Sequence, residues 1–148
     1  MKHKIRTEIV INASKEKVWS ILADLDAYAV WNPFIVKSEG SLEVGAKLKN
    51  TLQNGDKTIV FKPKVVEVAP NRSFGWLGSL WVKGLFDGHH YFEIEEISEN
   101  QVNLIHGENF SGILSSLILK QIGNDTRNNF VKMNQALKSR AEQLGVKR

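Results

Sequence analysis

Two histidines and a glutamate lie in a stretch of the chain whose alternation predicts β-strands. This stretch, Leu85 to Gly112, reads LFDGHHYFEIEEISENQVNLIHGENFSG. Successive side chains of a strand point to opposite faces of a sheet, so His90, His106 and Glu108 each share a face with large apolar side chains. Those apolar neighbours are Phe86, Phe92, Ile94, Val102, Leu104 and Phe110. Ionisable groups on an apolar face are candidates for chemistry, because their protonation depends on burial and on neighbouring charges.

The loop between the two strands decides which residues face each other. All the inward positions of both strands have even numbers. Two residues that pair across antiparallel strands point to the same face, so their numbers are both even or both odd and have an even sum. This requirement predicts a three-residue loop at 98–100, in which the asparagine takes the left-handed conformation. His90 then lies opposite Glu108, and Phe92 lies opposite His106.

A histidine paired with a carboxylate can give a proton to a ligand or take one from it. The carboxylate orients the imidazole and favours its charged form, whereas burial opposes that charge. His90 and Glu108 are therefore our candidates for catalytic residues. A hydrogen bond with a purely structural role explains the same pair equally well.

Other kinds of active site have less support in the sequence. Cysteine is absent, which removes thiolate nucleophiles and cysteine zinc sites. Ser111 and Ser115 have no base motif beside them. Two histidines and one carboxylate on neighbouring strands have low specificity as a metal pattern, so we predict no metal and no cofactor.

The length and composition of the chain limit the classes of function. Its 148 residues suit one domain, 1–148, with a single core or one ligand cavity. The chain has no apolar run of about 18 residues and no signal peptide pattern, so we expect a cytoplasmic protein without integral membrane association. A formal charge of +4 without a basic run disfavours nucleic acid as a partner. The sequence leaves a homodimer open.

Turn signals divide the chain into a first strand, two short helices, six further strands and a long helix. The first strand covers Lys2 to Asn12, Ser14 caps the first helix, and Pro33 ends the second helical turn. The further strands are expected at 34–40, 46–52, 58–68, 73–80, 85–97 and 101–110. Pro63 indicates a bulge or an edge position. Apolar spacing predicts one helix from Leu114 to Leu144, about 45 Å long.

The predicted long helix has a polar middle. Asp125, Thr126 and Asn129 interrupt its apolar stripe. Solvent or a bend at this point would explain the interruption, and so would a cavity beside the helix. We favour the cavity, because a fully packed core would leave these polar groups unpaired.

The order of elements and several motifs resemble the START-like (birch-pollen-allergen-like, SRPBCC) superfamily, in particular its members of the polyketide cyclase/dehydratase type. The motifs span the whole chain: residues 13–19, Leu22, Asp24, Leu25, Tyr28, residues 31–34, 74–76, 85–92 and 106–112, Met133, Asn134, Leu137, Lys138 and Glu142. The resemblance implies an α+β helix-grip fold, with a seven-stranded antiparallel sheet wrapped around a long C-terminal helix and two short helices after the first strand. It also implies a cavity between the sheet and the long helix.

Alternation along the strands and the long helix then predicts which side chains line this cavity. Trp31 and Asn32 are expected at its mouth, and Trp76 and Trp81 are candidates to stack on a planar ligand. The predicted ligand-binding residues are Trp31, Asn32, Phe74, Trp76, Phe92, His106, Phe110, Leu114, Ile118, Ile122, Asn129 and Met133.

Three functions are compatible with these residues. The first is a carrier or sensor of a small hydrophobic molecule of the lipid, polyketide or aromatic type. The second is a polyketide cyclase/dehydratase-type enzyme that uses His90 and Glu108 as an acid/base pair. The third is a module that binds a protein partner, as chaperone regulators do. We favour the first, because the predicted wall is mostly apolar with few polar groups.

Overall fold

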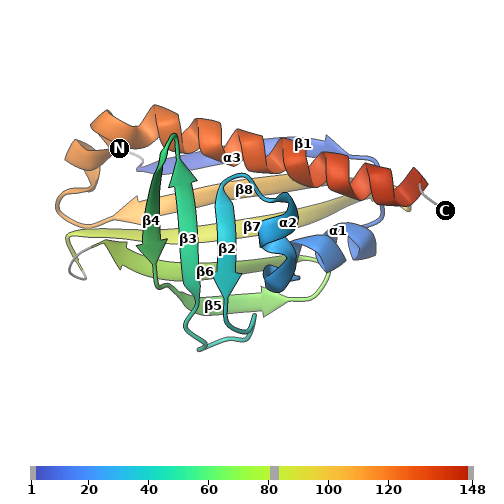
Figure 1. Cartoon of the computed structure of the whole chain (residues 1–148), viewed down its shortest axis with the longest axis horizontal. Helices are drawn as coiled ribbons and strands as arrows, with labels where there is room; N and C mark the ends of the chain where they lie inside the picture. Colours follow the sequence, from blue (N-terminus) through green and yellow to red (C-terminus); the bar gives the residue numbers. More distant parts are fainter. Residues whose placement is uncertain (1–2, 81–83, 147–148) are drawn as a thin grey trace.

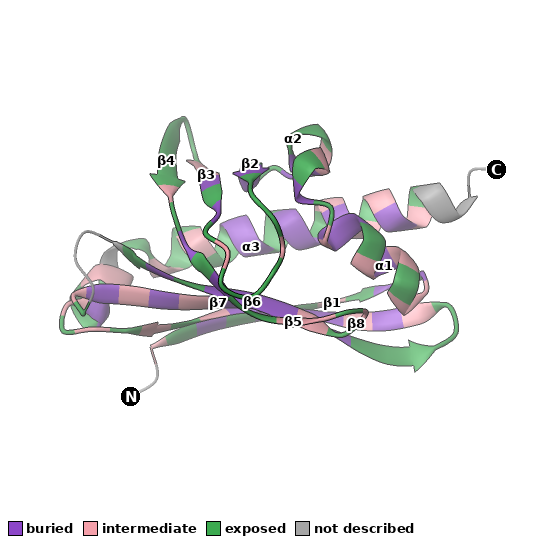
Figure 2. Ribbon diagram, turned by 90° about the horizontal axis from the view of Figure 1, so that it is seen from below, coloured by how far each residue is buried: buried purple, intermediate pink, exposed green. Residues whose placement is uncertain are grey.

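The computed structural model describes residues 3–80 and 84–146 (Figure 1). Five strands form one antiparallel sheet in the order β1-β8-β7-β6-β5, and three form a second sheet in the order β2-β3-β4. Figure 2 shows the long helix α3, the small sheet and the short helices on the same side of the large sheet. The site must therefore be sought between these two layers.

The elements follow the predicted order along the chain. The strand β1 (Lys4–Ile11) precedes α1 (Lys15–Leu22), a 3₁₀ turn (Leu25–Ala27) and α2 (Tyr28–Trp31). The Ser14 side chain caps α1 by accepting a hydrogen bond from the Lys17 backbone N–H, at 3.1 Å. The later elements are β2 (Ile35–Glu39), β3 (Lys49–Asn54), β4 (Lys57–Phe61), β5 (Lys64–Ala69), β6 (Ser73–Leu80), β7 (Phe86–Ser98), β8 (Gln101–Ser111) and α3 (Ser115–Val146).

The helix-grip fold is confirmed, with a correction to the number of strands. The strand predicted at 58–68 is two strands, β4 and β5, which separate at Lys62 and Pro63. Proline has no N–H to donate to a sheet, so the pairing of β4 with β3 ends before it. The described residues thus form eight strands in two sheets. A bridge between Lys47 and Lys64 joins the sheets.

The pairing of β7 with β8 has the predicted register at the histidines. His90 lies opposite Glu108, and Phe92 lies opposite His106. The predicted loop was wrong: the strands are joined by a two-residue turn, and Ile97 is an extra residue in β7. A turn shorter by one residue would alone put odd-numbered residues opposite even-numbered ones. The bulge shifts the register by one residue and cancels this effect, so the even-numbered residues still share a face.

The core lies between the large sheet and the second half of α3. Alternate residues of β7 are buried from Phe86 to Ile94, as the two-residue period predicts. The predicted single helix over 114–144 is found as α3, and its buried core residues are Phe130, Met133, Leu137 and Ala141. No helix among the described residues has the length and apolar character needed to cross a membrane.

Candidate functional site

A cavity of about 190 Å³ lies between the small sheet, the large sheet and α3. Its wall is mostly apolar, and each of the three elements contributes a part of it. The lining residues are Phe34, Ile35, Asn50, Leu52, Asn54, Ile59 and Phe61 from the β2–β4 region; Trp76, Phe86, Gly88, His90, Glu108 and Phe110 from β6–β8; and Ile122, Thr126 and Asn129 from α3. Such a wall suits a small molecule with a large apolar part.

The structure brings several of the predicted site residues to this cavity. They are Trp76, His90, Glu108, Phe110, Ile122 and Asn129. Asn129 is only 9% exposed, whereas the nearby Lys132 is exposed. Thr126 and Asn129 of the polar middle of α3 therefore face the cavity, whereas Asp125 is exposed and does not line it. The part that the predicted residues play in binding or catalysis stays a prediction.

Other predicted residues are buried in the packed part of the molecule and do not line the cavity. They are Phe74, Phe92, His106 and Met133. Trp19 of α1 packs edge-on against Phe74, with ring centroids 5.7 Å apart. The short helices thus fill this half of the sheet face. Alternation predicts which face a side chain occupies, but it does not predict which part of that face another element covers.

The remaining predicted residues lie away from the cavity lining. Leu114 and Ile118 are partly buried near the start of α3. The Asn32 side-chain oxygen accepts hydrogen bonds from the backbone N–H groups of Phe34 and Ile35, at 2.9 and 2.8 Å, so this side chain stabilises the turn before β2. Trp31 packs edge-on against Tyr28. Trp81 lies outside the described residues.

The sequence prediction missed the small sheet as a wall of the cavity. Asn50, Leu52 and Asn54 alternate along β3 and point to the cavity. Their alternation was the available signal, but two of the three side chains are polar. The opposite face of β3 is polar as well, so hydrophobicity did not distinguish the inner face from the outer one.

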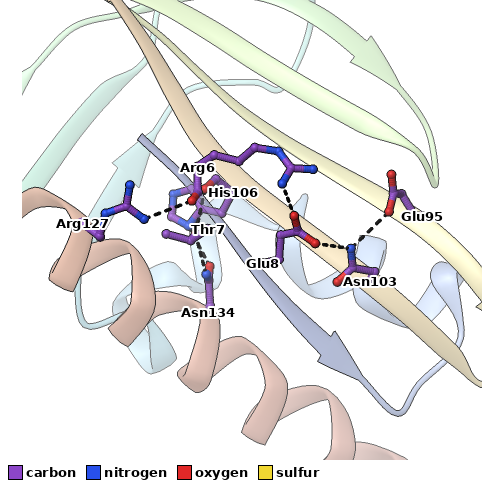
Figure 3. Close-up of polar contacts among 8 residues, drawn as sticks. All are labelled: Arg6, Thr7, Glu8, Glu95, Asn103, His106, Arg127 and Asn134. Atoms are coloured by element: carbon purple, nitrogen blue, oxygen red, sulfur yellow. Dashed lines mark hydrogen bonds and ion pairs between the residues drawn. The ribbon is translucent and has the colours of Figure 1, made fainter. Parts of the chain in front are cut away.

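A buried chain of polar side chains begins at the cavity and extends to β1. Glu108 Oε1 lies 3.3 Å from His90 Nδ1, and these side chains are 13% and 7% exposed. His90 Nε2 lies 2.8 Å from His106 Nε2, and His106 Nδ1 lies 2.8 Å from Asn134 Oδ1. Figure 3 shows Asn134 of α3 pointing toward Thr7 and His106, and its Nδ2 donates to Thr7 Oγ1 at 2.8 Å.

His106 occupies the middle of this chain and is fully buried. Burial, and then the charge of His90, lower the pKa of His106 well below its ordinary value, against the opposing effect of the Asn134 hydrogen bond. His106 is therefore a neutral imidazole at neutral pH, with one ring nitrogen that donates and one that accepts.

Gly88 makes room for the carboxylate of Glu108. A Cβ atom at residue 88 would collide with Glu108 Oε2. Gly88 and Glu108 both line the cavity. The missing side chain thus allows the carboxylate to lie beside β7 next to His90, in contact with the ligand space.

Two asparagines of β3 add polar groups to the cavity wall. Asn129 Nδ2 donates to Asn54 Oδ1 at 3.1 Å and so links α3 to the end of β3. Asn50 is 1% exposed, and its Oδ1 accepts a hydrogen bond from the Ser38 hydroxyl at 2.6 Å. Asn50 Nδ2 has no hydrogen-bond partner within the part of the chain that the structure describes. A buried donor of this kind favours a ligand that supplies an acceptor.

The two histidines are arranged for a hydrogen bond and not for a shared metal ion. Their Nε2 atoms face each other at 2.8 Å. Two nitrogens on one tetrahedral zinc lie roughly 3.3 Å apart, because each Zn–N bond is about 2.0–2.1 Å long. Over residues 3–80 and 84–146, no group of three or more His, Asp or Glu side chains is placed to hold a metal.

A family model described as polyketide cyclase / dehydrase and lipid transport matches residues 2–142 of the chain. The chain belongs to this family. No curated protein matches it by sequence. The resemblance drawn from the order of elements and the motifs is thereby confirmed, and the family covers both enzymes and lipid carriers by its description.

Solved structures share the fold at low sequence identity. The Zhui aromatase/cyclase from Streptomyces sp. R1128 is 15% identical, with a TM-score of 0.78 over 95% of this chain and 93% of that one. A START superfamily protein from Mycobacterium smegmatis is 20% identical, with a TM-score of 0.73 over 95% and 98%. Norcoclaurine synthase from Thalictrum flavum is 12% identical, with a TM-score of 0.67 over 96% and 95%. These likenesses establish the fold.

Proposed function

We propose that this chain binds a small, mostly apolar molecule of the lipid, polyketide or aromatic type in the cavity between its sheets and α3. The composition of the cavity wall is the observation that supports this proposal. Aromatic and aliphatic side chains form most of the wall, and His90 and Glu108 are the ionisable groups among the described residues that line it. A pocket with this composition gains affinity from apolar contact and orients the ligand through a few polar groups.

The size of the cavity limits the ligand. Its volume of about 190 Å³ is below the range of roughly 300–1,000 Å³ typical of pockets for drug-sized ligands. A molecule with one or two rings fits within it. Ile59 and Ile122 line the cavity and are 47% and 37% exposed, so they form part of its rim. A longer ligand would extend past these two residues.

Filling the cavity tests this proposal. Leu52→Trp places a large ring on the cavity side of β3, whereas Thr51→Trp places the same ring on the other face of that strand. Small molecules that co-purify with each protein are then identified by native mass spectrometry. We expect the wild type and Thr51→Trp to retain a bound apolar molecule that Leu52→Trp has lost. Equal retention by all three proteins would contradict binding in this cavity.

We also propose, as a second function, acid/base catalysis on a bound carbonyl compound. The distance of 3.3 Å between His90 Nδ1 and Glu108 Oε1, at the cavity wall, favours it. α-Tetralone is a suitable probe, because exchange of its α-hydrogens in D₂O requires a base beside the carbonyl group and can be followed by NMR. We expect the wild type to speed this exchange and His90→Gln to lose at least about 100-fold of the rate enhancement. Equal exchange rates with and without the wild-type protein would leave binding as the better account.

A further inference from the structure

Two glycines lie next to each other on the large-sheet side of the cavity. Gly78 of β6 pairs with Gly88 of β7, and both residues are buried. Residues paired across antiparallel strands point to the same face, so this face lacks a side chain at two adjacent positions. The next pair along the same face is Trp76 with His90, and both of these rings line the cavity. The two glycines therefore leave a hollow in the sheet face beside the ligand space.

Side chains from other elements enter this hollow. The carboxylate of Glu108 lies beside Gly88, and the ring of Phe61 lies against Gly78. A Cβ atom at residue 78 would be 2.5 Å from both Cε2 and Cζ of this ring, which is far closer than non-bonded carbon atoms approach. Phe61 and Gly88 line the cavity, whereas Gly78 does not. Phe61 thus covers the part of the sheet face that Gly78 would otherwise add to the cavity.

The fold holds Phe61 in this position. Phe61 is the last residue of β4, and it pairs with Asn50 of β3, which also lines the cavity. Two residues later, the Pro63 carbonyl accepts a hydrogen bond from the Leu48 backbone N–H at 2.8 Å. The chain then enters β5 at Lys64, beside β6. The two sheets are joined directly after Phe61, so its ring closes the cavity at the end where the sheets meet.

We propose that Phe61 is a specificity-determining residue that limits the length of the ligand, so that the cavity buries a compact molecule of one or two fused rings. This inference rests on the proposed function and names the size class of its ligand. A third ring in line with the first two would extend past the rim into water, where it gains no apolar burial. Without the Phe61 ring, the third ring could lie over Gly78.

Two hydroxyarenes that differ by one fused ring test this limit. Binding of 2-naphthol and 2-anthrol to the wild type and to Phe61→Ala is measured by fluorescence titration at pH 7. We expect the wild type to bind the two compounds with similar affinity. Phe61→Ala should raise the affinity for 2-anthrol relative to 2-naphthol at least about tenfold, because the third ring becomes buried. An unchanged ratio, or a wild type that already prefers 2-anthrol by this factor, would overturn the proposal.

Val60→Ala is the matched control. Val60 precedes Phe61 in β4, is 53% exposed and does not line the cavity. Its substitution should leave the ratio of the two affinities unchanged, and a shift as large as that of Phe61→Ala would contradict the role of the ring. If neither compound binds to any of the three proteins, the proposed function fails and the limit on length fails with it. If 2-naphthol binds but the ratio is the same in all three, the limit on length alone fails.

Gly78→Ala tests the contact with the Phe61 ring in the absence of ligand. Alanine suits the interior of a strand better than glycine does, but its Cβ would collide with the ring in the wild type. The next nearest atom, Pro63 Cβ at 3.3 Å, requires only a small adjustment. We expect Gly78→Ala to lower the urea midpoint of the wild type, and to leave it unchanged or raise it when residue 61 is alanine. An equal decrease in both backgrounds would show that the ring does not cover Gly78, and it would overturn the proposal.

Discussion

His106 couples the stability of the protein to pH. Its side chain is fully buried, and it receives its polar contacts from Asn134 and His90. Burial, which acts most strongly, and the charge of His90 lower the pKa of His106 well below its ordinary value. In the unfolded chain the imidazole takes up a proton near its ordinary pKa, about 6.5. Between these two pKa values the unfolded state binds more protons than the folded state.

The free energy of unfolding should therefore fall as the pH drops below about 6.5, by up to about 1.4 kcal/mol per pH unit from this group. The contribution is fully present above that pH. Urea unfolding of the wild type between pH 5 and 8 measures the slope. His106→Gln should show a smaller slope, because glutamine does not titrate. Identical slopes in the two proteins would contradict this role of His106.

The residues of the site differ in how well sequence alone predicts them. The register of His90 with Glu108 was predicted from the even numbers of the inward residues. It is correct although the predicted loop was wrong, because the extra residue Ile97 compensates for the shorter turn and the even-numbered residues still face inward. The partners of His106 could not be predicted in this way. Thr7 and Asn134 are 127 positions apart, and their contact depends on how α3 crosses β1 and β8. No local pattern encodes that crossing.

At the scale of the elements, the small sheet and α3 meet at the rim of the cavity. The hydrogen bond from Asn129 Nδ2 to Asn54 Oδ1, at 3.1 Å, joins them. Both residues line the cavity. Asn54 ends β3 at the turn into β4, so this bond holds the tip of the β3–β4 hairpin against the helix.

Removing this bond should loosen the hairpin. We expect Asn129→Ala to lower the free energy of unfolding by about 1 kcal/mol. Amide hydrogen exchange should become faster in β3 and β4, while the exchange of β7 and β8 should stay the same. Asn128→Ala, at the exposed neighbouring residue, provides the control. Faster exchange throughout the molecule would instead show that Asn129 supports the whole fold.

The element order could be predicted almost fully from sequence, because strong periodicity and turn residues mark each boundary. The division into two sheets was the exception. Pro63 was interpreted as a bulge or an edge position within one strand at 58–68, whereas one strand ends before it and a new strand begins after it. The structure places the next strand, β5, beside β6. The small sheet thereby becomes a separate wall, which is why its cavity residues were missed.

At the scale of the whole molecule, one half of the space between the layers is packed and the other half holds the cavity. Phe130 belongs to the packed half, where its ring stacks on His106 with centroids 4.1 Å apart and is fully buried. Phe110 lines the cavity and is partly exposed, with its ring stacked on Phe86 at 5.3 Å. The two phenylalanines therefore allow a matched comparison of stability and binding.

We expect Phe130→Ala to lower the free energy of unfolding by about 3–5 kcal/mol, because the substitution opens a void in a close-packed region. Phe110→Ala should cost less, since its ring already borders open space, but it should weaken the binding of 2-naphthol about three- to tenfold through the lost aromatic contact. Urea unfolding and calorimetry measure the two quantities on the same proteins. Equal losses of stability in the two variants would contradict the division into packed and open halves, because they would mean that the cavity wall supports the fold as strongly as the core does.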